Sequence, residues 1–172
     1  MEKLRGGKIK VGLADTTFAR ADMAAYAMDE IRKKFPKMKV EFVRRTVPGI
    51  KDLPVECKLL YEQDKCDIVM AFGMAGKEQV DKMCTHEASL GIQMTKLMLG
   101  KHIIEVFVHE DEGKDEADLL SIFEDRSRKH AINAILIATN QQELVKMAGK
   151  GLRQGKQHAG AIGAAGKTGV QK

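Results

Sequence analysis

The sequence contains no tryptophan, and only 5% of its 172 residues are aromatic. Aromatic side chains are the platforms on which single-stranded bases stack, so this composition disfavours a nucleic-acid binder of that kind. Cysteine is also scarce: Cys57, Cys66 and Cys84 are odd in number and show no C-x-x-C spacing. This usage argues against a disulfide framework and against a cysteine-rich zinc site, and it predicts reduced, buried thiols.

Long hydrophobic runs are missing as well. No window of about 18 uncharged apolar residues occurs, and basic residues interrupt the first ten positions, so neither a membrane span nor a signal peptide is predicted. We therefore expect a soluble, cytoplasmic protein with no membrane partner.

Acidic residues are absent from positions 146–172, which hold six basic residues. The rest of the chain keeps 23 of the 29 basic residues against 24 acidic ones, so the net charge of +5 belongs to the C-terminal stretch. A basic tail is more often a solvated extension than a reader of nucleic acid, and we predict no nucleic-acid partner.

What the sequence does contain is a regular alternation of apolar patterns, with 44% hydrophobic residues overall. Strands are predicted at 8–14, 40–47, 66–72 and 103–108. Helical patterns follow each of them, and those after the last strand cover 115–138, with a possible break, and 141–148. The alternation predicts an α/β fold with a parallel sheet, right-handed crossovers and helices on both faces. We expect one domain over residues 1–155 and a flexible, basic, Gly/Ala-rich tail over 156–172.

Ligands of such sheets bind beyond the carboxyl ends of the strands. That rule places the candidate site on four loops, at 15–18, 48–52, 73–77 and 109–113. The second loop lies in the segment TVPGIKDLP, where Gly49 permits a positive φ, Asp52 can cap the next helix and Pro54 suits its first turn. The amides of residues 50–52 would then point at a ligand, although a plain tight connection explains the same residues.

The third loop, GMAGK, lacks the pattern of a P-loop because Ala71 and Glu78 replace the required Gly and Ser/Thr. Gly73 and Gly76 still allow a planar ligand to approach the backbone, and Lys77 is either a stabiliser of a developing anion or a solvated lysine.

Single titratable residues have competing interpretations. His86-Glu87 is not a zinc motif because position 90 is Leu, and a lone helical histidine is more often packed than catalytic. Glu105 shares a strand face with Phe107 and His109, so it needs a partner or a polar cavity unless that face meets water. The acidic residues between 110 and 118 lack EF-hand spacing and favour a helix start. Phe18 is a core aromatic by default, or else a stacking platform.

Six blocks of the sequence together resemble the archaeal-type riboflavin synthases, a family related in fold to lumazine synthase. The blocks are ADTTFARADMA, RRTVPGIKDLP, CDIVMAFGMAGK, THEASLG, KHIIEVFVHEDE and MAGKGLRQG. The likeness covers residues 8–155 and excludes only the Gly/Ala-rich tail.

The resemblance implies a four-stranded parallel sheet of lumazine-synthase-like (flavodoxin-like) architecture, and a homopentamer with sites between adjacent subunits. It also implies an enzyme that transfers a four-carbon unit in the last step of riboflavin biosynthesis. Two molecules of 6,7-dimethyl-8-ribityllumazine dismutate through a pentacyclic adduct to riboflavin and 5-amino-6-ribitylamino-pyrimidinedione. No redox cofactor takes part, and a divalent metal such as Mg²⁺ stays open. The alternatives are a lumazine synthase and a non-catalytic lumazine or flavin carrier.

The resemblance also implies a set of site residues. Matched to the PGAFEIP-like corner of lumazine synthases, the amides of residues 50–52 hold a ribityl chain, while Phe18 stacks on the heterocycle. Glu105 lies near the position from which a neighbouring subunit covers the site. The predicted binding residues are Thr17, Phe18, Gly49, Ile50, Lys51, Asp52, Gly73, Met74, Ala75, Gly76, Val106 and Arg126.

Two departures from the lumazine synthase pattern limit the transfer of roles. The R-G-x-T-x-H signature is absent after the third strand, so the role of its histidine does not pass to His86. Either Arg126 or Arg128 lies near the place of a phosphate-binding arginine, although the lumazine substrate has no phosphate.

The chemistry requires that the C7 methyl group of a lumazine lose a proton and that the resulting anion spread over the ring. We predict that Lys77 stabilises this anion and that His86 or His109 moves protons, with Glu105 completing the catalytic set. No metal ligands are predicted.

Overall fold

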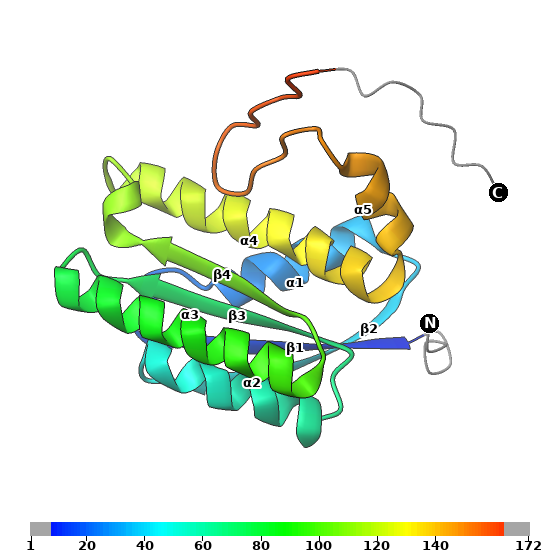
Figure 1. Ribbon diagram of the computed structural model, residues 1–172, viewed down its shortest axis with the longest axis horizontal. Coiled ribbons are helices and arrows are strands. Elements are labelled where there is room, and N and C mark those ends of the chain that lie inside the picture. Colours follow the sequence, from blue (N-terminus) through cyan, green and yellow to red (C-terminus); the bar gives the residue numbers. More distant parts are fainter. Residues whose placement is uncertain (1–7, 164–172) are drawn as a thin grey trace.

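The computed structural model describes residues 8–163 and confirms the α/β fold class. Four strands, β1 (Lys8–Thr16), β2 (Lys39–Val47), β3 (Ile68–Ala75) and β4 (Ile103–His109), form one parallel sheet in the order β2-β1-β3-β4 (Figure 1). The order reverses between β1 and β3, which is the point where ligands of doubly wound sheets bind. Five helices and two 3₁₀ turns connect and follow the strands: α1 (Met23–Lys34), η2 (Ile50–Asp52), α2 (Leu53–Glu62), α3 (Gln79–Leu99), η3 (Glu110–Glu112), α4 (Glu116–Thr139) and α5 (Gln141–Met147).

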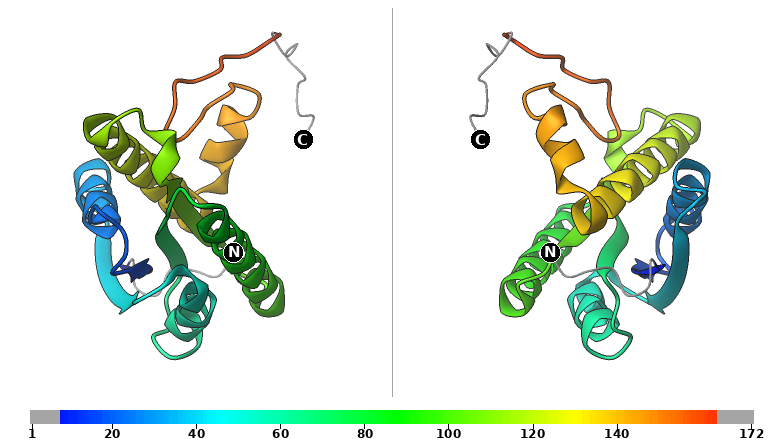
Figure 2. Two further views of the ribbon diagram at one scale, coloured as in Figure 1. Left: turned by 90° about the vertical axis from the view of Figure 1, so that its left-hand side faces the viewer. Right: turned by 90° about the vertical axis from the view of Figure 1, so that its right-hand side faces the viewer.

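Helices cover both faces of the sheet, as predicted. Helices α1 and α4 pack on one face and α2 and α3 on the other, and Figure 2 shows the two pairs on opposite sides of the sheet. The first layer buries Met23, Ile31 and Phe123 against alternate residues of β1 and β3, and the second buries Leu53, Leu60 and Ile92. Every residue of β3 is buried, which explains its uninterrupted apolar sequence.

Several predicted boundaries are wrong, and each has a physical cause. Strand β3 runs on to Ala75 because residues 73–75 pair with Phe107, Val108 and His109 of β4, so these three residues are not a loop. Strand β1 likewise continues to Thr16, which pairs with Val47. Helix α4 is unbroken from Glu116 to Thr139, with Asp115 as its N-cap and acidic residues in its first turn, as expected for a helix start.

Two of the three thiols are buried as predicted. Cys57 and Cys66 lie in the core, where burial raises the pKa of each thiol to about 12. Cys84 is only half-buried, so the prediction is wrong there, because the buried face of α3 consists of Thr85, Ala88, Ile92 and Thr95.

The segment after α5 has no helix or strand among the described residues and returns along α4 (Figure 1). It is tied down at Gly155, whose amide N–H donates to Asp125 Oδ2 at 2.7 Å. The division of the chain at residue 155 stays a prediction, and residues 164–172 of the predicted tail lie outside the described residues. Between residues 8 and 163, no helix combines the length and the apolar character that a membrane span needs.

Candidate active site

The corner after β2 is built from backbone rather than from the predicted side-chain cap. Gly49 has a φ of −131°, which is extended, so the predicted positive φ is wrong. Asp52 stands at the N-cap position of α2 but makes no side-chain cap hydrogen bond. Its amide N–H instead donates to the Gly49 carbonyl at 3.3 Å, and this η2 turn runs directly into α2 with Pro54 in the first turn. The side-chain cap is unnecessary because the η2 turn already supplies backbone hydrogen-bond acceptors at the start of α2.

The same corner is fixed to two neighbouring elements. The Lys51 ammonium lies 2.5 Å from Glu87 Oε2 on α3. On the other side, the Thr17 amide donates to the Val47 carbonyl at 2.9 Å, and the Thr17 hydroxyl donates to the Pro48 carbonyl at 3.4 Å. The first amides of η2 have no acceptor within their own turn and stay available as donors.

Phe18 follows Thr17 and is 55% exposed, so its assignment to the core is wrong. Its position is set by the end of β1, where the buried Asp15 accepts hydrogen bonds from Arg44 and from the Thr46 hydroxyl, the latter at 2.6 Å. These contacts hold the end of β1 against β2. The exposed ring beside a fixed corner suits a stacking platform.

The end of β3 is closely packed. A Cβ atom at Gly73 would lie 2.8 Å from Ile50 Cδ1 and 3.0 Å from Phe107 Cε1, so only glycine lets these two side chains close over the strand. The close approach at Gly73 is therefore made by the chain itself. Met74, Ala75 and Gly76 are buried, whereas Lys77 is exposed.

His86 is exposed on α3, next to the Glu87 that binds Lys51, so it is not a packed core histidine. Neither His86 nor Lys77 lines the three best-formed cavities among residues 8–163.

A polar groove of about 370 Å³ lies along β4 between α3 and α4. It is lined by Thr85, Ser89, Glu105, Phe107, His109, Glu112, Arg126 and His130. The Ser89 hydroxyl donates to Glu105 Oε1 at 2.8 Å. Glu105 thus has both the partner and the polar cavity that its place in an apolar strand required.

Two buried polar atoms of this groove lack a hydrogen-bond partner in the described part of the chain. They are Glu105 Oε2 and His109 Nδ1. Buried polar atoms without partners are costly, so such atoms point to a ligand or to a second chain that completes the groove.

Arg126 forms the end wall of the groove. Its Nη1 donates to the Phe107 carbonyl at 2.6 Å and to Glu112 Oε1 at 2.8 Å, while Nη2 donates to Glu112 Oε2 at 2.6 Å. Burial opposes ionisation of Glu112, but the hydrogen bonds from Arg126 and the His109 amide outweigh it and lower the pKa of this carboxyl to about 2.

Of the two candidate arginines, only Arg126 belongs to the groove. Arg128 instead contacts Asp29 and Glu30 on α1, at 2.5 and 3.2 Å, and ties the two helices together. Val106 is fully buried in the core between the sheet and α1 and α4, so only its backbone lies at the edge of β4.

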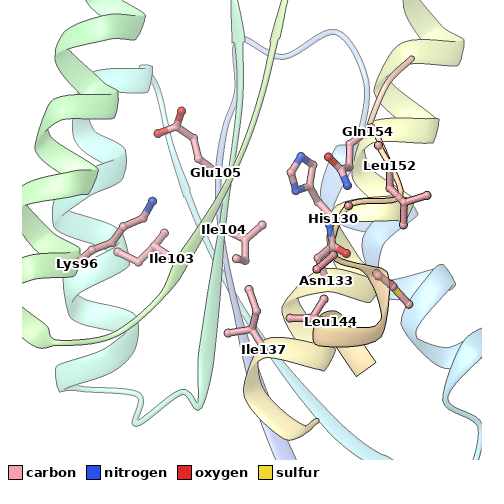
Figure 3. A pocket seen from close by; sticks show the side chains of 14 residues that line it. Lys96, Ile103, Ile104, Glu105, His130, Asn133, Ile137, Leu144, Leu152 and Gln154 are labelled. Carbon is pink, nitrogen blue, oxygen red and sulfur yellow. The ribbon is translucent and has the colours of Figure 1, made fainter. Parts of the chain in front are cut away.

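His130 was not predicted from the sequence. It lies one helical turn after Arg126 on α4 and lines the groove and also a second cavity of about 670 Å³ (Figure 3). Burial and the charge of Arg126 lower the pKa of the His130 ring to about 4. The available signal was its i+4 spacing from Arg126, which places both on one helix face.

The predicted residues thus fall on two surfaces of one chain. Thr17, Phe18, the 49–52 corner and Lys77 stand at the ends of β1, β2 and β3, while Glu105, His109 and Arg126 share the groove at β4. Within the part of the chain that the structure describes, no group of three or more His, Cys, Asp or Glu is arranged to hold a metal ion.

Comparison with known proteins gives consistent matches. The family model for 6,7-dimethyl-8-ribityllumazine synthase matches residues 8–142. The riboflavin synthase of Methanothermobacter marburgensis is 51% identical over 154 residues, which cover 90% of this chain and 99% of that protein. The riboflavin synthase of Archaeoglobus fulgidus is 44% identical with the same coverages, and that of Aeropyrum pernix is 46% identical over 88% of this chain and 97% of its own. The chain therefore belongs to the archaeal-type riboflavin synthases, within the 6,7-dimethyl-8-ribityllumazine synthase family.

Proposed function

We propose that this protein is a riboflavin synthase. Two molecules of 6,7-dimethyl-8-ribityllumazine react through a pentacyclic adduct, and one passes a four-carbon unit to the other. The products are riboflavin and 5-amino-6-ribitylamino-pyrimidinedione. The observation that carries the proposal is the 51% identity to a riboflavin synthase along 99% of that protein's length. The cytoplasmic location predicted from the sequence remains a prediction.

The two products together contain the atoms of the two substrates, so the reaction needs no external oxidant or reductant. We propose that no redox cofactor is required, and a divalent metal such as Mg²⁺ stays open. Assays after EDTA treatment decide this: an unchanged rate would exclude a metal requirement, and a fall in rate that Mg²⁺ restores would establish one.

The first requirement of the reaction is to hold two identical heterocycles in contact. Fixing two reactants in the right geometry contributes about 7–11 kcal/mol in well-oriented systems. We propose that Phe18 stacks on one ring and that the amides of Ile50 and Lys51 bind its ribityl chain, because the Asp52 amide already donates to the Gly49 carbonyl. The exposure of Phe18 and its hydrogen-bonded link to the corner through Thr17 support this role.

We propose that a complete site forms between two copies of the chain, with the strand ends of one copy facing the β4 groove of the next. The unpartnered Glu105 Oε2 and His109 Nδ1 support this, because a second chain at the groove would supply partners for such atoms. A homopentamer is the assembly that the family resemblance implies.

Helix α3 carries a second feature that supports assembly. Apolar side chains that are each more than half exposed follow one another at helical spacing on its outer face: Val80, Met83, Leu90, Met94 and Leu97. We name this set the α3 row. An exposed apolar row of this length is typical of a surface that another chain covers.

Proton transfer is the second requirement. The C7 methyl group of one lumazine must lose a proton, and we propose that Lys77 stabilises the anion that forms. Between the two predicted histidines, His109 is the better supported, because its unpartnered nitrogen lies in the groove with Glu105 while His86 is exposed.

The decisive experiment is incubation with the lumazine alone. Formation of fluorescent riboflavin together with the pyrimidinedione is the expected result. A lumazine synthase would make nothing without dihydroxybutanone phosphate, and a carrier would bind the lumazine without turnover. Either result would contradict the proposal.

Two variants test the assigned roles. Replacement of Lys77 by Met should lower the turnover rate at saturating lumazine, and an unchanged rate would remove Lys77 from the mechanism. His109→Ala should change the pH profile of turnover, whereas a profile of the parent's shape would count against His109.

A further inference from the structure

The ring of His130 lies where two cavities meet at the edge of β4. Both the groove of about 370 Å³ and the larger cavity of about 670 Å³ are lined by Glu105 and His130. Figure 3 shows these two side chains on opposite sides of β4, with Glu105 towards α3 and the His130 ring extending from α4. A planar ligand lying along this edge would therefore contact both residues.

The surroundings of His130 keep its ring uncharged. Burial is the larger cause and the nearby Arg126 charge the smaller, and together they lower the pKa of His130 to about 4. The other charged or titratable groups around the two cavities are Lys96 on α3, Glu105 and His109 on β4, and Glu112 in η3.

We propose that His130 accepts the proton that leaves the C7 methyl group of a lumazine bound in this groove, which leaves the other proton transfers of the reaction to His109. The assignment rests on the proposed function. The methyl C–H bond breaks, the proton passes to an imidazole nitrogen, and the electron pair spreads over the lumazine ring. After the four-carbon unit has been transferred, the imidazolium returns the proton to a nitrogen of the departing pyrimidinedione. The transfer is balanced without any further reactant.

The geometry also answers how a weakly basic ring could take up this proton. As the proton leaves, negative charge develops on the lumazine beside His130, and an opposite charge within a few ångströms favours the protonated imidazole. In the absence of ligand, this negative charge does not develop and the ring stays ready to accept a proton.

The test uses the intact protein in D₂O and follows the C7 methyl signal of the lumazine by proton NMR. Exchange of this signal reports proton removal even when no riboflavin forms. We expect His130→Ala to lower enzyme-dependent exchange by about 100-fold, the usual scale of a lost general base. Lumazine affinity should change by less than about threefold, and added imidazole should restore part of the exchange. His102→Gln, an exposed histidine outside both cavities, is the matched control.

A variant that folds, binds the lumazine and exchanges the methyl protons at the wild-type rate would overturn the assignment. The assignment would also be overturned if exchange were lost in both His130→Ala and the smaller His130→Gly and added imidazole restored it in neither. A third outcome is that the wild type exchanges the methyl protons, that His130→Ala does not, and that no riboflavin forms. This outcome would contradict the proposed function and still support the role of His130. The two proposals can therefore fail separately.

Discussion

The ion pair between Glu112 and Arg126 allows a quantitative prediction about stability. Replacement of Glu112 by Gln removes the negative charge while keeping the size of the side chain and one acceptor oxygen. In the native protein this carboxylate accepts two hydrogen bonds from Arg126 and one from the His109 amide at 2.9 Å. Its side chain is only 20% exposed, so solvent screens the pair weakly.

The size of the effect follows from the pKa. The pKa of Glu112 falls from 4.5 to about 2 in the folded protein. Because the folded value lies below the unfolded one, ionisation stabilises the fold, and this stabilisation is complete above the unfolded pKa. It is lost as the pH falls from about 4.5 towards 2, and its total is about 3 kcal/mol.

Urea unfolding at a fixed protein concentration, repeated at several pH values between about 6 and 2, measures this contribution. The free energy of unfolding of the wild type should fall by about 3 kcal/mol more than that of Glu112→Gln across this range. Glu62→Gln serves as a control, because Glu62 forms only an exposed pair with Lys58 at 3.8 Å and should follow the wild type. Parallel pH curves for the wild type and Glu112→Gln would refute the reasoning.

Three further changes test the groove, the assembly and the C-terminal segment. Ser89→Ala removes the only hydrogen-bond donor to the Glu105 side chain found among residues 8–163. In a fluorescence assay, riboflavin formation should slow by about tenfold in this variant, whereas Ser89→Thr should retain most of the activity. Met94→Glu puts a charge into the α3 row and should dissociate the assembly, as sedimentation velocity would show. Gln93→Glu, at an exposed position of the same helix, should leave the assembly intact. An intact assembly in both variants would contradict the role of the row. Gly155→Ala should release the segment from α4 and speed tryptic cleavage at Arg153, because its Cβ would lie 2.5 Å from Arg126 Nε. Gly149→Ala shares a positive φ but meets nothing within 4 Å, so equal cleavage of both would refute the contact.

The order and type of the elements could be predicted because their patterns are local. The sequence pattern of each strand indicates which of its faces is buried. The unbroken apolar run of β3 indicates a strand covered on both faces of the sheet, and the pattern of β4 indicates a strand that is only partly covered. The ends of β1 and β3 could not be predicted, because residues 73–75 resemble a Gly-containing loop until β4 supplies partners for them. Pairing between distant segments thus overrides local propensity there.

The corner after β2 shows a second limit. The presence of Gly49, Asp52 and Pro54 correctly indicated a tight strand-to-helix connection. The detailed conformation was wrong, because Gly49 is extended and Asp52 leaves its side chain free. Local turn chemistry allows several solutions, and the contacts of Ile50 with Gly73 and of Lys51 with Glu87 select one of them.

The groove at β4 was predictable only through Glu105, whose charge stands out in an apolar strand. Ser89 and His130 come from α3 and α4, and each lies in a helix rich in other polar residues. Their meeting depends on how two helices flank one strand. The i+4 spacing of His130 from Arg126 indicates a shared helix face, but it does not indicate that Ser89 of the other helix lies near it. Arg128 illustrates the same limit, because only the packing of α4 on α1 separates its role from that of Arg126.

The two edges of the sheet give the strongest physical reason for expecting a second chain at β4. Strand β2 forms one edge and carries Glu41, Arg44 and Arg45, all held in ion pairs within the chain. Charged residues of this kind discourage pairing with another strand. Strand β4 forms the other edge, and in its sequence IIEVFVH only Glu105 and His109 are polar. Each of these two residues has a buried atom without a partner among residues 8–163. One edge is thus protected by charge, while the other lacks such protection and carries hydrogen-bonding groups without partners. The proposed assembly through β4 would explain both the apolar edge and the incomplete groove.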